Sequence, residues 1–384
     1  MYLLEHDAKE LLASGGIVVP AGCLVESPEA LSAAQLPAAP WVVKGQIGAG
    51  GRGKAGLIRK AANESELKSA LAAVLGATAG HRRVQAARVE QDMGDVREAY
   101  VAFLLDPASG GVRVVLSARG GVDVEQLPRE YILSAVALPE AEPLVNCVRR
   151  LARELPPRVV AALGDAGVRL ARAFVEHEAL LLEVNPLFVH DDGRWTAGDV
   201  KMVIDDAALP RQPGLRALIE RRSRAYPEAT LRHEQGFDYV VVDPEGEIGL
   251  LTTGAGLSMM LIDELHAAGL KPYNFLDIRT GELRGDTRRL TRVLEWVSQG
   301  RRVRVLFVNI FAGITDLGEF SRLLVAALSE VPKLKVPVVA RLIGNGLPAA
   351  REALAAAGVP LYTDLDDAIA DVRSRLGGRN DAVT

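Results

Sequence analysis

The last third of the chain repeats a single pattern, in which a short apolar segment is followed by a glycine-containing loop and then by a helical segment. The apolar segments are residues 248–252, 303–309 and 336–343, and a shorter one near Leu361 precedes a helix at 364–376. The pattern predicts parallel strands joined by helical crossovers, which is a doubly wound sheet. Such sheets bind ligands at the carboxyl ends of their strands. We therefore expect the loops that contain Gly254, Gly313 and Gly344 to form a binding edge.

The first part of the chain lacks this regularity. Helices are predicted at 5–14, 66–75, 142–153 and 157–177, and Ser27-Pro28 predicts the start of another. Strands are predicted at 41–44, 84–90, 99–105, 112–117, 180–185 and 195–201. This order is α+β, with hairpins in place of crossovers. Because residues 226–236 are polar and basic, we expect a boundary near residue 235, with domains at 1–235 and 236–377 and a flexible tail at 378–384.

Composition narrows the class of protein. The 384 residues carry a net charge of −4 with mixed signs, which gives no reason to expect nucleic acid binding. The two cysteines, Cys23 and Cys147, have neither disulfide nor metal spacing and suit a reducing compartment. Charges at Glu5, Asp7 and Lys9 argue against a signal peptide, and no apolar run approaches the roughly 18 residues of a membrane span. The expectation is a soluble cytoplasmic protein.

A glycine-rich segment follows the apolar residues 41–43. Lys44 ends the apolar run, five glycines fall between Gly45 and Gly53, and Arg52 and Lys54 add charge. Glycines allow a backbone to approach a polyanion closely, and backbone N–H groups and cations then bind it. The segment therefore predicts a phosphate-binding loop.

Two familiar phosphate motifs match this loop by letter. Gly48, Gly50 and Gly53 satisfy the dinucleotide fingerprint, and Gly48 with Gly53-Lys54 satisfies most of a Walker A sequence. Each motif needs a helix that begins at the last glycine, and the Walker A motif needs Ser or Thr where this chain has Ala55.

The residues after the loop do not favour a helix there. Gly56 interrupts them, residues 57–59 read as a short strand, and a capping box appears only at Asn63 and Glu66. A glycine-rich hairpin over phosphates, with Lys44 entering from a strand, fits best, and a flexible surface turn is the alternative.

Glu183 and Asn185 alternate with apolar residues in the predicted strand at 180–185, and Asn185 suggests a magnesium site. The loop 191–193 is typical of a three-residue hairpin, and counting back across it pairs Asn185 with Asp199 and Glu183 with Lys201. Asn185 and Asp199 then present oxygen ligands on one face, as magnesium prefers. A cross-strand polar pair beside a Glu183–Lys201 ion pair is the alternative.

These features together resemble the ATP-grasp superfamily, and in particular the β subunit of succinyl-CoA synthetase (succinate–CoA ligase). The likeness covers almost the whole chain and rests on specific motifs. They are LLEHDAK (3–9), WVVK (41–44), GGRGKAG (50–56), EVNPL (183–187), GAGL (254–257), NFLD (274–277) and VNIF (308–311). The resemblance implies an N-terminal ATP-grasp fold of two subdomains followed by a flavodoxin-like CoA-ligase domain.

The resemblance also implies roles for individual residues. Those implied to bind ATP are Lys44, Gly51, Arg52 and Gly53 at the phosphates, and Glu90 and Glu98 on the side of the base and ribose. Asn185 and Asp199 would bind Mg²⁺, Arg52 would assist catalysis, and Glu183 would orient a phosphohistidine of the partner. Pro20 is typical of members that use ATP rather than GTP.

The family mechanism needs a second subunit. ATP phosphorylates a histidine, the phosphoryl group passes to a carboxylic acid, and the thiol of coenzyme A attacks the acyl phosphate. The histidine and most of the CoA site belong to an α subunit, and none of the six histidines here has the setting of a phosphorylated nucleophile. The chain would therefore supply Mg-ATP chemistry to an α partner.

The residues implied to face the acid depart from the family. Thr253 replaces the usual Asn, Arg279 to Glu282 replace a run of glycines, and Asp316 follows the loop Gly313-Ile314-Thr315. Arg119 and Ile343 stand where acidic residues are common. We expect a paralogue for a different small carboxylic acid, and neutral drift around a succinate site is the alternative.

Two other functions fit parts of the sequence. A stand-alone ATP-grasp carboxylate ligase would need no α subunit, but it would not explain the C-terminal doubly wound domain. A non-catalytic nucleotide-binding regulatory subunit would not need Lys44, Glu183, Asn185 and Asp199 together.

Overall fold

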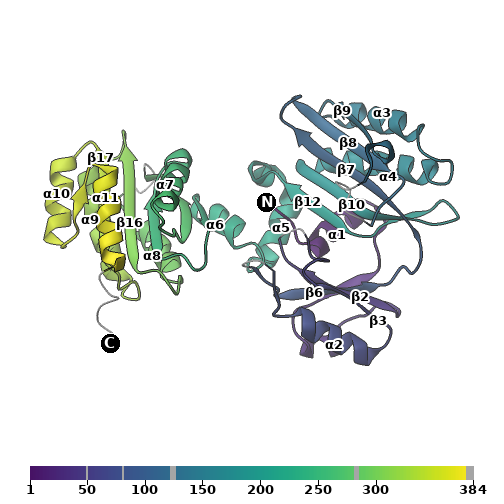
Figure 1. Cartoon of the computed structure of the whole chain (residues 1–384), viewed down its shortest axis with the longest axis horizontal. Coiled ribbons are helices and arrows are strands. Elements are labelled where there is room, and N and C mark those ends of the chain that lie inside the picture. The colour runs from purple at the N-terminus through teal and green to yellow at the C-terminus, as the bar shows by residue number, and fades with distance from the viewer. Residues whose placement is uncertain (49–50, 80–81, 122–126, 281–284, 378–384) are drawn as a thin grey trace. The chain divides into compact units, whose positions relative to one another are not determined.

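The computed structural model describes residues 1–48, 51–79, 82–121, 127–280 and 285–377. They belong to two compact units, unit 1 (Met1–Ala225) and unit 2 (Tyr226–Thr384) (Figure 1). The predicted tail at 378–384, together with Gly50, Gly281 and Glu282, lies outside the described residues. In the described ranges, no helix combines the length and apolar character that crossing a membrane requires.

The first sheet of unit 1 carries the predicted glycine-rich hairpin. Its order is β1 (Gly22–Val25), β6 (Ala86–Gln91), β2 (Trp41–Gln46) and β3 (Ile58–Ala61), and all neighbours are antiparallel. Helix α2 (Glu64–Val74) buries its apolar face on this sheet, and Asn63 caps it by accepting a hydrogen bond from the Glu66 N–H at 3.0 Å. Strand β3 follows the loop directly, so the predicted hairpin is confirmed and neither helix-dependent motif applies.

The second sheet of unit 1 contains the predicted magnesium hairpin. Its order is β11 (Trp195–Ala197), β10 (Ala179–Val189), β7 (Arg97–Asp106), β8 (Gly111–Ser117) and β9 (Leu133–Ala137), and β12 (Val200–Ile204) also pairs with β10. Helices α3 (Ala141–Ala152) and α4 (Val160–Glu176) pack against each other and against this sheet. The predicted strand at 195–201 is two strands, because the N–H groups of Gly198 and Asp199 both donate to the Pro186 carbonyl and interrupt the ladder.

The register of this hairpin agrees with the sequence count. Glu183 lies opposite Lys201, and the Asn185 N–H donates to the Asp199 carbonyl at 3.0 Å. At the turn, Gly193 has φ +82°, the left-handed conformation in which glycine has no steric cost.

Helix α1 (Glu5–Ser14) has the predicted bounds and contacts β12. The helix predicted at Ser27-Pro28 is instead a 3₁₀ turn, η1 (Glu29–Ala33), in which the Ser27 hydroxyl accepts from the Ala30 N–H at 3.3 Å. The other elements of unit 1 are short: β4 (Thr78–Ala79), β5 (Arg82–Arg83), η3 (Arg129–Tyr131), η4 (Asp206–Arg211) and α5 (Pro213–Arg221).

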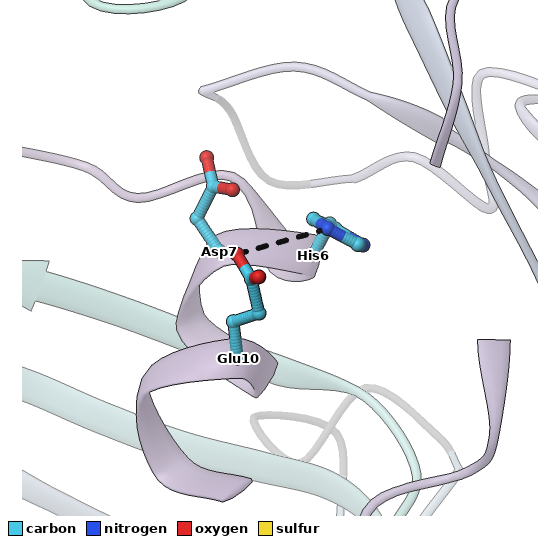
Figure 2. A group of neighbouring side chains, drawn as sticks. All are labelled: His6, Asp7 and Glu10. Atoms are coloured by element: carbon cyan, nitrogen blue, oxygen red, sulfur yellow. Dashed lines mark ion pairs between the residues drawn. The ribbon is translucent and has the colours of Figure 1, made fainter. Parts of the chain in front are cut away.

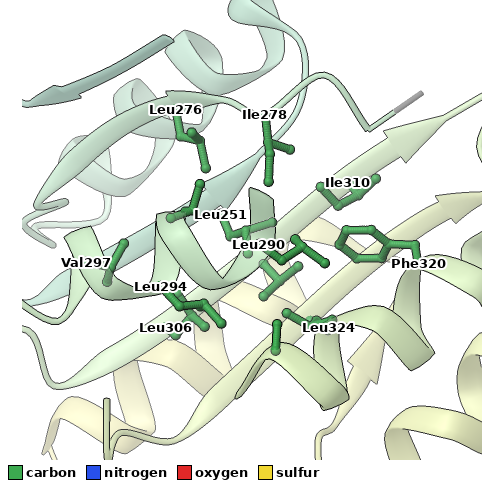
Figure 3. Close-up of a cluster of buried hydrophobic side chains, with 14 of the residues drawn as sticks. Leu251, Leu276, Ile278, Leu290, Leu294, Val297, Leu306, Ile310, Phe320 and Leu324 are labelled. Carbon is green, nitrogen blue, oxygen red and sulfur yellow. The ribbon is translucent and has the colours of Figure 1, made fainter. Parts of the chain in front are cut away.

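Unit 2 is the predicted doubly wound parallel sheet. Its parallel strands run in the order β14 (Ile248–Thr252), β16 (Val305–Ala312), β17 (Val338–Gly344) and β18 (Leu361–Tyr362). Helices α7 (Ala255–Ala267) and α11 (Leu365–Gly377) pack on one face of the sheet. Helices α8 (Arg288–Val297), α9 (Leu317–Glu330) and α10 (Leu347–Ala356) pack on the other, where residues such as Leu251, Leu290 and Phe320 form the core (Figure 3).

A buried asparagine helps to attach a further strand to this sheet. Strand β15 (Asn274–Asp277) pairs with β13 (Asp238–Val241), which follows helix α6 (Pro227–Gln235). On its other side, the buried Asn274 side chain accepts from the Leu250 N–H at 2.8 Å and donates to the Leu250 carbonyl at 2.9 Å. The amide thus replaces a pair of ladder hydrogen bonds between β15 and β14.

Candidate active site

Lys44 is at the centre of a buried ion network in unit 1. Its Nζ lies 2.6 Å from Glu90 Oε1 and 3.0 Å from Glu5 Oε1, and it donates to the Gly198 carbonyl at 3.0 Å. Strands β2 and β6 carry Lys44 and Glu90, helix α1 carries Glu5, and Gly198 lies between β11 and β12. Four separate segments of the first unit thus meet at one ammonium group.

Arg52 connects this network to the predicted magnesium ligands. Its Nη1 lies 2.5 Å from Glu5 Oε2, and its Nη2 lies 2.6 Å from Asp199 Oδ1. Because Arg52 belongs to the loop between β2 and β3, these two ion pairs hold the glycine-rich hairpin over Lys44. Gly51 and Gly53, its neighbours in sequence, have open space where a Cβ would stand, and Gly51 has φ +76°.

Glu5 and Lys9 belong to the same network, although no role in the site was predicted for them from the sequence beyond their place in the motif at 3–9. Lys9 Nζ lies 2.6 Å from Glu5 Oε1 and 2.7 Å from Glu90 Oε2, and it donates to the Gly198 carbonyl at 2.6 Å. A signal was present in the sequence, because Glu5, Lys9 and the apolar Leu12 fall on one stripe at helical spacing. Charges on a stripe that an apolar residue continues indicate a buried polar network.

Local charge sets the protonation of these groups. Burial alone would raise the pKa of Glu5, but Arg52, Lys44 and Lys9 hold it well below its ordinary value. Burial likewise opposes the charge of Lys44, yet Glu5 and Glu90 raise the pKa of its ammonium group above its usual range. Both residues are therefore charged at neutral pH, and the Lys44 ammonium supplies the positive charge that a polyanion site requires.

Asn185 and Asp199 suit a magnesium ion. Asn185 Oδ1 accepts from the Gly121 N–H at 2.7 Å, and the main chains of Asn185 and Asp199 are hydrogen-bonded across the hairpin. Burial, followed by repulsion from Glu5, raises the pKa of the Asp199 carboxyl. An amide oxygen and a partly exposed carboxylate on facing residues of one hairpin are a donor set that fits a hard divalent cation.

The other predicted residues of this unit lie around the network. Glu183 Oε2 is 3.8 Å from Lys201 Nζ, so the ion pair of the alternative interpretation is present but long. The Glu98 carboxylate lies against Gly121, where an added Cβ would be 1.6 Å from Glu98 Oε2, and burial raises the pKa of this carboxyl.

Arg88 links the predicted specificity residue Pro20 to Glu90. Its Nη2 donates to the Pro20 carbonyl at 2.8 Å and its Nε donates to Glu90 Oε2 at 2.7 Å. The segment around Pro20 is therefore fixed relative to the buried carboxylate of β6.

A second cluster on α1 has metal-ligating residue types but not the surroundings of a metal. His6, Asp7 and Glu10 lie close together, and the Glu10 side chain turns toward His6 (Figure 2). Arg222 Nε is 2.7 Å from Asp7 Oδ1, and Arg88 Nη1 is 2.9 Å from His6 Nδ1. Two guanidinium groups already neutralise the cluster, so it does not fit a cation.

The residues predicted to face the acid lie at the carboxyl edge of the sheet in unit 2. Thr253 directly follows β14, and the segment Gly313-Ile314-Thr315 follows the neighbouring β16. The Thr280 and Thr315 hydroxyls are 3.0 Å apart, which joins the segment after β15 to the loop after β16. Ile314 is 96% exposed.

Arg279 has a backbone conformation that favours glycine. Its φ is +53°, and its guanidinium Nη2 lies 3.4 Å from Asp238 Oδ2. The side chain thus stands where the family resemblance implies a glycine, and it is half-exposed.

Comparison with known proteins gives a consistent result along the chain. Residues 2–189 match the family described as ATP-grasp domain, and residues 251–374 match the family described as CoA-ligase. The β subunit of ADP-forming succinate–CoA ligase from Chloroflexus aurantiacus is 37% identical over 364 residues, which covers 92% of this chain and 93% of that protein. The corresponding subunit from Ignicoccus hospitalis is 34% identical over 375 residues, with coverage of 96% and 97%.

Two further similarities concern other acids. A protein named probable malate–CoA ligase subunit β, from Mesorhizobium japonicum, is 35% identical over 373 residues and covers 93% of each chain. The solved structure of ATP citrate lyase from Methanothrix soehngenii, in complex with citrate and coenzyme A, superposes with a TM-score of 0.72. It covers 98% of this chain and 99% of that one at 20% identity, which shows a shared fold.

Proposed function

Because the chain belongs to the family of ADP-forming succinate–CoA ligase β subunits, we propose that it binds Mg-ATP in unit 1 and phosphorylates a histidine of an α partner. The phosphoryl group then passes to a small carboxylic acid, and coenzyme A attacks the acyl phosphate. The observation that carries this proposal is that Lys44 and Arg52 share the buried carboxylate of Glu5. Arg52 also pairs with Asp199, which lies opposite Asn185 in the hairpin.

Lys44 and Arg52 bind the phosphates of ATP. Both side chains are charged, and both are held by carboxylates rather than by solvent, so their positions are set before the nucleotide arrives. Pre-organised cations stabilise the charge of a transferring phosphoryl group without reorganisation during the reaction. The backbone of Gly51 and Gly53 has room for close approach to the phosphates. Glu90 and Glu98 lie toward the base and ribose.

Asn185 and Asp199 hold the magnesium ion. When bound, the ion neutralises the phosphate oxygens and fixes their orientation for in-line transfer. Arg52 Nη2 lies 2.6 Å from Asp199 Oδ1, so this guanidinium group would lie between the metal ligand and the phosphates. Tyr2 lies near this carboxylate, and burial raises the pKa of its phenol to about 12, so it stays protonated as a hydrogen-bond donor.

Glu183 orients the phosphohistidine of the partner. Its Oε2 lies 3.8 Å from Lys201 Nζ. A carboxylate beside an imidazole N–H fixes the tautomer and ring orientation, so that the opposite ring nitrogen faces the phosphoryl group. Most of the CoA site lies on the α partner.

The acid binds at the carboxyl edge of the sheet in unit 2. Thr253, Gly313, Ile314 and Thr315 lie on loops that follow neighbouring parallel strands. Succinate or a related acid is the substrate class. Arg279 in a glycine-favouring conformation and the Thr280–Thr315 hydroxyl pair favour an acid other than succinate, and the likeness to a probable malate–CoA ligase subunit makes hydroxylated dicarboxylates the first acids to test.

A reconstituted complex tests this function. The chain and its α partner are assayed for ADP release across a panel of acids that includes succinate, malate and monocarboxylates of equal length. We expect acid- and CoA-dependent ADP release with a preference for an acid other than succinate. Strong preference for succinate would contradict the altered specificity, and ADP release that needs no α partner would favour a stand-alone ligase.

A further inference from the structure

We propose that Glu5 is a positioning residue for ATP: it holds the phosphate-binding cations together and keeps Arg52 over the site when Asp199 binds the metal. This inference rests on the nucleotide site proposed above and adds helix α1 to it. Glu5 is the first residue of α1 and is buried.

One carboxylate meets three cations at this point. Glu5 Oε1 is shared by Lys9 at 2.6 Å and Lys44 at 3.0 Å, while Oε2 accepts from Arg52 at 2.5 Å. Three positive groups this close repel one another strongly in a buried environment unless an anion lies between them. Glu5 therefore determines how closely Lys44 and Arg52 can approach each other.

Glu5 and Asp199, the two carboxylates that pair with Arg52, differ in their other binding partners. Asp199 is a candidate metal ligand, so its contact with Nη2 competes with the metal. Glu5 bonds only cationic groups among its contacts in the network, and it is tied into the first turn of α1. When Asp199 is occupied, Glu5 is the anchor that still holds Arg52 and the hairpin loop in place.

Lys9 stabilises the positions of the carboxylates that pair with Lys44. It is completely buried and contacts Glu5, Glu90 and the Gly198 carbonyl, the same three residues that Lys44 contacts. Lys9 does not need to reach a ligand for this role. It supplies the charge that keeps two buried carboxylates, Glu5 and Glu90, in position behind Lys44.

Nucleotide titration of the full-length chain separates positioning from simple structural support. Binding of ATP and of its non-hydrolysable analogue AMP-PNP is measured by calorimetry for wild type, Glu5→Gln and Glu5→Asp, together with the thermal midpoint of each. We expect Glu5→Gln to raise the dissociation constant at least about tenfold. Glu5→Asp, which keeps the charge, should recover part of this loss.

The double variant Glu5→Gln/Lys9→Met decides between the two roles. It removes one charge of each sign, and a buried ion pair can often be replaced by neutral side chains without loss of stability. We expect the thermal midpoint to recover toward wild type while ATP binding stays weak, because Arg52 still lacks its anchor. Recovery of both would mean that Glu5 acts only through stability and would overturn the proposal.

Glu10→Gln is the matched control, because Glu10 lies on the same helix but pairs with Arg221 and Arg222. It should bind ATP as wild type does. Unchanged ATP binding in Glu5→Gln would refute the positioning role while leaving the nucleotide site intact. Absence of ATP binding by the wild type would instead refute the proposed function.

Discussion

The buried histidine of α1 predicts a specific dependence of stability on pH. Arg88 Nη1 lies 2.9 Å from His6 Nδ1, and since a guanidinium group always donates, Nδ1 must carry a lone pair. Burial, reinforced by Arg88, lowers the pKa of His6 from 6.5 to about 3. Folded His6 is therefore neutral at pH 5.5 and above.

The direction of this pH dependence follows from the number of protons that His6 binds in the folded and unfolded states. Below about pH 6.5 the unfolded chain binds a proton at His6 that the folded protein does not bind until about pH 3. This contribution to stability is therefore complete above pH 6.5 and falls as the pH is lowered. With these two pKa values, His6 removes about 1.4 kcal/mol of unfolding free energy between pH 7.5 and pH 5.5.

Urea unfolding at the two pH values measures this difference. In a Trp296→Phe background the remaining tryptophans, Trp41 and Trp195, both report on the first unit. The comparison variant is His6→Gln, whose side-chain oxygen can still accept from Arg88 but does not titrate. We expect wild type to lose about 1.4 kcal/mol more than His6→Gln between pH 7.5 and pH 5.5. Equal losses in the two proteins would refute a neutral His6 held by Arg88.

Two further substitutions test other parts of the structure. Glu183→Gln should leave the ATP dissociation constant within about twofold but slow phosphoryl transfer to the α partner about a hundredfold or more, since it removes only an orienting carboxylate; equal slowing of transfer and loss of ATP affinity would contradict this role. Asn274→Leu should leave the Leu250 N–H and carbonyl buried without their partners, and should lower the unfolding free energy of unit 2 by about 2–5 kcal/mol in urea unfolding followed by Trp296 fluorescence. A loss below about 1 kcal/mol would show that the amide does not hold β15 against β14.

Most of the fold was predictable because its signals are local. The parallel sheet of unit 2 follows from apolar segments that alternate with glycine loops, and the register of β10 with β11 and β12 follows from one three-residue turn. The break at Gly198 was not predicted, because it depends on the Pro186 carbonyl across the hairpin. The helix expected to start at Ser27-Pro28 was also wrong: the segment forms one 3₁₀ turn, Glu29–Ala33, and the chain becomes extended at Ala34.

The candidate site, like the fold, was predicted from the sequence only where its signals are local. The sequence motifs identified Lys44, Asn185 and Asp199, because their residue types suit phosphate and metal binding. In the structure, Lys44 and Asp199 belong to the ion network, and Asn185 lies opposite Asp199 in the hairpin. Glu5 and Lys9 were missed as site residues because their partners lie on other elements: Lys44 on β2, Arg52 on the hairpin loop and Glu90 on β6. Long-range ion pairs leave no spacing in the sequence, and only the interrupted apolar stripe of α1 indicates them.

Transfer of labelled phosphate to the partner is the most direct test of the central claim, which is that this chain uses Mg-ATP to phosphorylate an α subunit. The chain is mixed with its α partner and γ-labelled ATP, and the partner is tested for a label that acid removes and base does not. We expect rapid labelling of the α subunit that needs magnesium and is lost in Asp199→Asn. Labelling that is equal without a divalent cation or with Asp199→Asn would contradict the account, as would formation of acyl phosphate by this chain alone.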